Sequence, residues 1–120
     1  MQWCLSFPLD VRFRDMEPSP ALEAFAHRWA AKLANVYDRI ERCEVVIERP
    51  HQHQRRRQPV HVRVTVSVPG TDIVVTDDHA PDGVADDAFI AVRDAFRAAR
   101  RRLVMQARRD YHGDVAVARA

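Results

Sequence analysis

The sequence predicts an α+β domain in the order β-α-β-β-β-α, with a four-stranded sheet and two helices packed on one face of it. Two observations predict this fold. Several segments alternate apolar and polar residues, which is typical of half-buried strands, and two others place apolar residues three and four apart, as helices do. The seven prolines lie at or near the ends of these segments. Since each strand has one apolar face, both helices are expected to cover that face.

The N-terminal half contains the first strand, the first helix and the second strand. Residues 9–14 alternate apolar and charged side chains, which predicts a strand. Ser19 can cap a helix whose first residue is Pro20, and the helix is expected to end near Asn35. Alternation over residues 40–49 predicts the second strand. The apolar positions of the helix are Leu22, Phe25, Ala26, Trp29, Leu33 and Val36.

The C-terminal half contains two strands and a long helix. Residues 60–68 hold five valines at alternate positions, and Pro69-Gly70 makes a turn, so a strand containing Ile73 should return antiparallel. The acidic stretch 77–87 is expected to be a connection whose carboxylates suit the start of the next helix. That helix is predicted to reach about Tyr111, because apolar residues recur three and four apart at Phe89, Val92, Phe96, Ala99 and Leu103.

Length and composition fit one domain. The chain has 120 residues, 47% of them hydrophobic, which is enough for one modest core. We assign this domain to residues 1–112, with 1–7 as an N-terminal extension and 113–120 as a disordered tail. No long apolar run or signal peptide is present, so a cytoplasmic location without a membrane partner is expected. Cys4 and Cys43 are interpreted as reduced packing residues.

Positive charge is concentrated in one stretch. Residues 93–109 contain seven arginines and one aspartate, a formal charge of +6, whereas the remainder of the chain carries −4. On a helix, Arg93, Arg97, Arg101 and Arg108 fall within a stripe about 80° wide, beside the apolar stripe. Arg100 lies at the edge nearest the core. Repulsion between like charges four apart costs a few tenths of a kcal/mol per pair, a cost that bound phosphate would remove.

This arginine row predicts a nucleic-acid partner. The planar guanidinium binds phosphate oxygens through two hydrogen bonds, and neutralising about six phosphates gives a salt slope of log K near −5. Arg28 and Lys32, four apart on the first helix, extend the surface if the helices lie side by side. A solvated helix face, and two ordinary exposed cations, are the structural alternatives.

Short motifs along the chain resemble the ribosome hibernation promoting factor family, also called the ribosome-associated inhibitor RaiA family, in its short form. The residues that carry the resemblance extend in order from about Pro8 to Leu103, and the segment from Asp87 to Leu103 fits the second helix of the family without gaps. The motifs are Pro20-Ala21-Leu22, Lys32-Leu33, Tyr37-Asp38-Arg39-Ile40 and Val68-Pro69-Gly70.

The resemblance implies a domain similar to a double-stranded RNA-binding domain that binds the small ribosomal subunit, or the whole ribosome, in the channel used by mRNA and tRNA. Binding there blocks translation and protects idle ribosomes. The expected rRNA-binding residues are Arg28, Lys32, Arg93, Arg97, Arg100, Arg101 and Arg108. Lys32 matches the family directly, and the arginines are inferred from the charge pattern. The resemblance implies a non-enzymatic protein, and no cofactor or small-molecule substrate is expected.

This sequence departs from the family at several positions. Phe13 stands where the family often has glycine, the connection over 50–59 is arginine-rich, and the 77–87 connection is long. The chain ends without the C-terminal dimerising domain of long members, so ribosome pairing by that route is not expected. The oligomeric state stays open.

Other functions are weighed against this interpretation. A general structured-RNA-binding module and a protein-interaction domain with an acidic partner both fit the arginine row. His51 and His53 do not form a metal site beside three arginines, and the acidic stretch lacks the spacing of a calcium loop. A hydrolase or nuclease at Asp10, Asp15 and Glu17 lacks a nucleophile, base and metal constellation. The exposed sheet face is a further candidate for a partner contact, through Arg63, Thr65 and Thr76.

Overall fold

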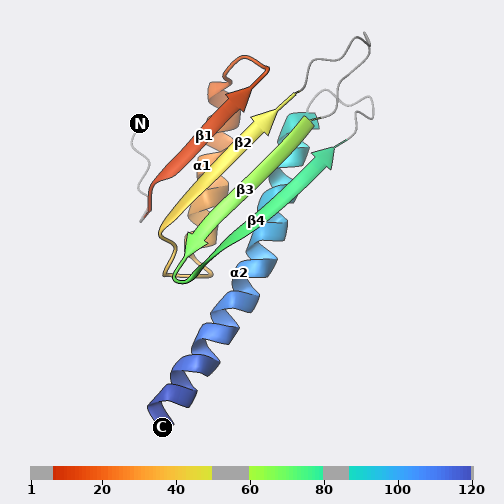
Figure 1. Cartoon of the computed structure of the whole chain (residues 1–120). Helices are drawn as coiled ribbons and strands as arrows, with labels where there is room; N and C mark the ends of the chain where they lie inside the picture. The colour runs from red at the N-terminus through yellow and green to blue at the C-terminus, as the bar shows by residue number, and fades with distance from the viewer. Residues whose placement is uncertain (1–6, 50–59, 80–86, 120) are drawn as a thin grey trace.

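The structure, a computed structural model, describes residues 7–49, 60–79 and 87–119. Two helices and four strands follow one another in the predicted order (Figure 1). The α+β prediction is therefore confirmed. The elements are β1 (Leu9–Arg14), α1 (Pro20–Ala34), β2 (Arg42–Glu48), β3 (Val60–Val68), β4 (Thr71–His79) and α2 (Asp87–Arg119).

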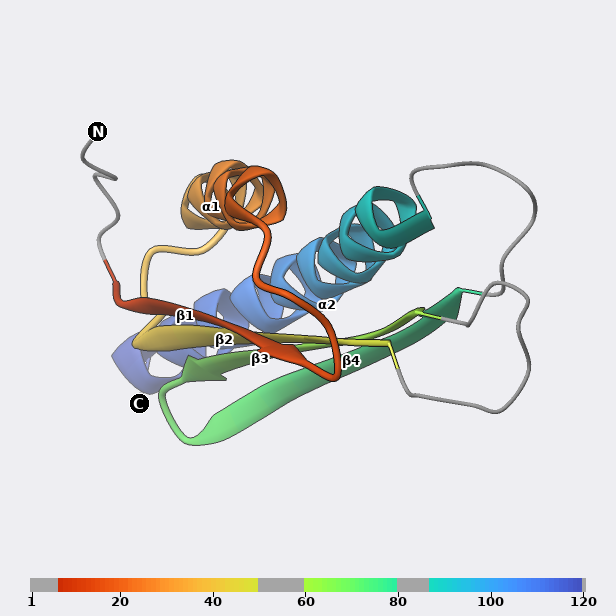
Figure 2. The same ribbon diagram turned by 90° about the horizontal axis from the view of Figure 1, so that it is seen from above.

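The four strands form one mixed sheet in the order β1-β2-β3-β4. β1 runs parallel to β2, and the other neighbours are antiparallel. The register aligns one valine from each strand, Val11, Val45, Val64 and Val75, in a row across the sheet. Figure 2 shows both helices on the same side of this sheet, as the one-sided apolar pattern predicts.

The core lies between the sheet and the two helices. All five alternating valines of β3 are at most 2% exposed. α2 lies over β3 and β4 and also packs against α1. Its buried residues include four alanines, which let the helix backbone approach the valine face closely: Ala88, Ala91, Ala95 and Ala99.

Local signals position α1 and the β3–β4 turn. The Ser19 side chain accepts a hydrogen bond of 3.2 Å from the Leu22 backbone N–H, and Pro20 is the first helical residue. This confirms the predicted cap, which contributes about 1 kcal/mol. Gly70 has φ of +85°, a conformation that other residues rarely adopt, so the glycine of the Pro69-Gly70 turn is required by the backbone.

Strand and helix boundaries differ from the prediction in two places. β4 runs to His79, so Asp77 and Asp78 belong to a strand and not to the connection, because pairing with the nine-residue β3 continues through these positions. Asp82 and Asp86 lie outside the described residues. α2 continues past Tyr111 to Arg119, where the sequence suggested a disordered tail, and extends beyond the end of the sheet (Figure 1). Valine and alanine dominate residues 115–118, and neither terminates a helix.

Candidate nucleic-acid interface

All seven predicted rRNA-binding residues lie on the two helices. Six of them, on α1 and α2, are exposed, and Arg93 is half-buried. Their backbone positions are set by two helices that pack on one face of the sheet. The six exposed residues are Arg28, Lys32, Arg97, Arg100, Arg101 and Arg108.

The arginine row faces solvent more directly than the sequence suggested. The predicted apolar stripe consists of the large apolar residues of α2 and Ala99. With the stripe defined in this way, the arginine row lies beside it. The structure also buries Ala88, Ala91 and Ala95, and these residues shift the centre of the buried face toward the sheet. Arg97, Arg101 and Arg108 therefore lie almost opposite the core. Alanine is compatible with either side of a helix, which is why periodicity alone placed the stripe inaccurately.

A groove of about 380 Å³ lies between α1 and α2. Lys32 and Asn35 from α1 and its C-terminal cap face Arg97 and Arg100 from α2 across this groove. Three cations from two helices thus line one concave site. The remaining lining is apolar and comes from Trp29 and Val36.

Trp29 is one of the residues that line this groove. Its ring is stacked on Phe96 of α2, with centroids 6.4 Å apart and planes 20° apart. The Lys32 ammonium lies 4.4 Å from the centroid of the same ring, a cation–π contact that holds it at the groove. Trp29 is half-buried and packs against the core, so it acts as the packing residue that the sequence predicts.

The cations of the row differ in their pairing. Arg93 Nε is 3.1 Å from Asp94 Oδ1 on the next residue of the helix. Within the described part of the chain, no carboxylate lies within ion-pair distance of Arg97, Arg100, Arg101 or Arg108. Like-charged neighbours without counterions produce a strong positive potential, which attracts polyanions.

The other two arginines of the stretch lie toward the sheet edge. Arg102 Nη1 donates a 2.6 Å hydrogen bond to the backbone carbonyl of Val74 in β4. Arg109 lines a small hollow with Arg102, Ile73 and Met105. The arginine stretch therefore divides into a solvent-facing row and a sheet-edge pair. Arg102 lies seven residues, about two turns, after the buried Ala95 and so on the side of α2 that faces the sheet.

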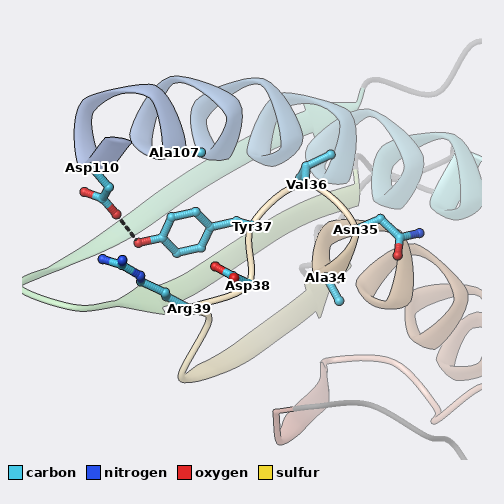
Figure 3. A pocket seen from close by; sticks show the side chains of 8 residues that line it. All are labelled: Ala34, Asn35, Val36, Tyr37, Asp38, Arg39, Ala107 and Asp110. Carbon is cyan, nitrogen blue, oxygen red and sulfur yellow. Dashed lines mark hydrogen bonds between the residues drawn. The ribbon is translucent and has the colours of Figure 1, made fainter. Parts of the chain in front are cut away.

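A second cavity, of about 350 Å³, lies where the α1–β2 connection meets α2 (Figure 3). The Tyr37 hydroxyl donates to Asp110 Oδ2, and Gln106 Nε2 donates to Asp110 Oδ1 at 3.0 Å. Burial, followed by the hydrogen bond to Asp110, raises the pKa of Tyr37 to about 12. Tyr37 is 5% exposed, so it is a packing residue that also makes a polar contact, and periodicity does not reveal that contact.

The weaker sequence candidates do not assemble into a second centre. Asp10 pairs with Arg42 at 3.4 Å on the open sheet face, and Arg12 pairs with Glu44. Among the described residues no three side chains of the metal-binding types form a cluster. Cys43 is a free, buried thiol whose pKa is raised to about 12 by burial. The histidines and arginines of the 50–59 connection, together with Cys4, lie outside the described residues.

A shallow hollow of about 180 Å³ lies on the open sheet face. Arg14, Glu48, Arg63 and Thr76 are among its lining residues. Arg63 and Thr76 are exposed and Thr65 is half-buried, so part of this face is accessible to a partner, as the sequence suggests. Across residues 7–49, 60–79 and 87–119, no helix is both long enough and apolar enough to cross a membrane.

The fold and this surface define a small α+β domain in which two helices cover one face of a four-stranded sheet and carry the basic face. The chain belongs to the family described as Sigma 54 modulation protein / S30EA ribosomal protein, whose model matches residues 9–110. This confirms the family to which the sequence motifs pointed, one of ribosome-associated hibernation and interface factors.

Solved structures agree on the fold. The N-terminal domain of protein Y from Thermus thermophilus superposes with a TM-score of 0.62 at 16% identity, covering 80% of this chain and 93% of that one. A ribosomal subunit interface protein from Coxiella burnetii gives the same TM-score and identity, covering 83% and 97%. No curated protein matches the sequence.

Proposed function

We propose that this protein is a ribosome hibernation factor that binds rRNA of the small subunit in the mRNA and tRNA channel and so arrests translation. The contact is made by the arginine row of α2 together with the groove between the helices. Family membership and the subunit-interface description of the Coxiella burnetii structure support the ribosome as the partner. A cytoplasmic location and the lack of a catalytic reaction are part of the same proposal.

The observation that carries the proposal is the convergence of Lys32, Arg97 and Arg100 on one groove. Two helices hold these cations on opposite walls, so a backbone phosphate entering the groove would be contacted from both sides. Arg101 and Arg108 continue the charge along α2, and Arg28 continues it along α1. Cations arranged on two helices would contact the phosphates of folded RNA and recognise its shape, and not its base sequence.

The test is co-sedimentation with purified small subunits and whole ribosomes on sucrose gradients. The variant Arg97→Glu/Arg101→Glu reverses two charges of the row, and Arg14→Glu/Arg63→Glu reverses two exposed charges on the open sheet face with the same change in net charge. Circular dichroism verifies that both variants fold. We expect the native chain and the sheet variant to travel with ribosomes and the row variant to be lost from them.

Salt and competitor experiments separate the alternative functions. Binding through about six phosphates should give a log K versus log salt slope near −5. Equal affinity for bare duplex RNA and for ribosomes would favour a general RNA-binding module. Binding that survives RNase treatment would favour an acidic protein partner, and equal binding by both charge variants would refute the role of the row.

A further inference from the structure

Residues 104–110 of α2 have few apolar contacts with the rest of the domain. Over residues 88–110 of α2, Leu103 is the last fully buried side chain, and after it Ala107 alone packs partly against the core. Residues 104–110 form the next two turns of the helix and include Arg108. Packing of apolar side chains therefore does not account for how this part of the helix is held.

Side-chain hydrogen bonds connect this part of α2 to the rest of the domain where apolar contacts are few. Tyr37 and Asp110 are 73 residues apart in the sequence, and their side chains are joined by the hydroxyl-to-carboxylate hydrogen bond. Gln106, one turn earlier on α2, donates to the other oxygen of the same carboxylate at 3.0 Å. Figure 3 shows the Tyr37 ring lying alongside α2, with the Arg39 side chain pointing toward the same end of the cavity.

The connection between α1 and β2, which carries Tyr37, is hydrogen-bonded to the end of α1. The backbone N–H groups of Asn35, Val36 and Tyr37 donate to carbonyls of Lys32 and Leu33 at 3.0 to 3.2 Å, which closes the end of α1 as a tight turn. Tyr37 is buried, and Ile40 enters the core three residues later. The Tyr37 hydroxyl therefore comes from a residue whose backbone is hydrogen-bonded and whose ring is buried, and it contacts Asp110 from outside α2.

We propose that Tyr37 and Asp110 are positioning residues, which hold α2 beyond Leu103 against the domain and so set the place of Arg108 relative to the groove cations. This inference rests on the proposed function. Arg108 lies about 7.5 Å beyond Leu103 along the helix axis. A tilt of about 15° at that point would move Arg108 by about 2 Å, which is enough to lose a hydrogen bond to a phosphate oxygen.

The first test is hydrogen exchange of the α2 amides in Tyr37→Phe, a variant that removes the hydroxyl and keeps the ring. A hydrogen bond to a charged group shifts a local equilibrium by about ten- to hundredfold. We therefore expect exchange over residues 104–110 to be about tenfold faster or more, with residues 92–102 unchanged. Asp110→Ala should reproduce the effect, and Asp38→Ala, which removes a neighbouring exposed carboxylate from the same cavity, should not.

The second test is a double-mutant cycle on ribosome affinity, measured by quantitative pelleting. Tyr37→Phe should weaken binding about three- to tenfold in the native background and change it little when Arg108→Ala is already present, because the two changes act through one contact. A purely structural role of Tyr37 would give the same loss in both backgrounds.

The outcomes separate this inference from the proposed function. Unchanged exchange over 104–110 in Tyr37→Phe overturns the restraint itself, whatever the ribosome does. Faster exchange with undiminished affinity, or with equal losses in both backgrounds, overturns the positioning role. If the native chain does not bind ribosomes, the proposed function and the positioning role fail together, and the exchange data still decide whether Tyr37 restrains the helix.

Discussion

Replacement of Trp29 by alanine is expected to destabilise the domain by about 3 kcal/mol. Large-to-small core substitutions of tryptophan cost about 3 to 5 kcal/mol, and the lower end applies because Trp29 is half-buried. The loss includes the stack on Phe96 and the edge contact with Phe25, at 6.4 and 6.5 Å, each contributing about 0.5 to 1.5 kcal/mol. Trp29→Phe keeps an aromatic ring at the site and should cost about 1 kcal/mol.

The assay is urea denaturation followed by circular dichroism, because removing Trp29 also removes a fluorescence probe. With a denaturant slope of about 1 to 3 kcal/mol per molar, Trp29→Ala should lower the midpoint by about 1 to 3 M. The same variant frees the Lys32 ammonium from its ring contact, so ribosome affinity should fall even at temperatures where the protein is fully folded. A loss of stability under 1 kcal/mol, or a Trp29→Phe variant as unstable as Trp29→Ala, would refute the role assigned to this ring.

Two further predictions concern the sheet edge and the buried thiol. Arg102→Ala removes the hydrogen bond to the Val74 carbonyl on edge strand β4, and we expect more self-association in analytical ultracentrifugation than for Arg101→Ala, which makes the same charge change; equal behaviour would contradict an edge-protecting role. Because the pKa of Cys43 is raised to about 12 in the folded state from a reference value of 9, its contribution to stability is complete below pH 9 and is lost as pH rises from 9 toward 12. The free energy of unfolding, measured by urea denaturation, should therefore fall over this interval by up to about 1.4 kcal/mol per pH unit, and Cys43→Ala should show a shallower fall.

The fold was predictable because its signals are local. β3 is bounded by Pro59 and by Pro69-Gly70, and its valines alternate without interruption, so its ends agree with the prediction. α1 carries its cap, its first-turn proline and its apolar stripe in consecutive residues. Each of these signals acts within a few residues, and the physical rules that interpret them need no knowledge of the rest of the chain.

The site was predictable only in part, since it depends on distances between segments. The arginine row could be identified from its charge, and Lys32 from the family motif. The groove exists because α1 packs beside α2, and the contact between Tyr37 and Asp110 joins residues 73 positions apart. The division of Arg102 from its neighbours depends on which side of α2 faces β4, and the buried alanines that decide it carry no clear periodic signal.

The small side chains beneath α2 have a consequence for how this surface can change over evolution. Ala88, Ala91, Ala95 and Ala99 face a sheet of valines, so the thickness of the layer between helix and sheet is set by methyl groups. Enlarging one of them would raise part of the helix and carry several arginines outward together, without altering any residue that contacts a partner. The shape of the charged face can therefore be tuned from the interior, while its composition stays the same.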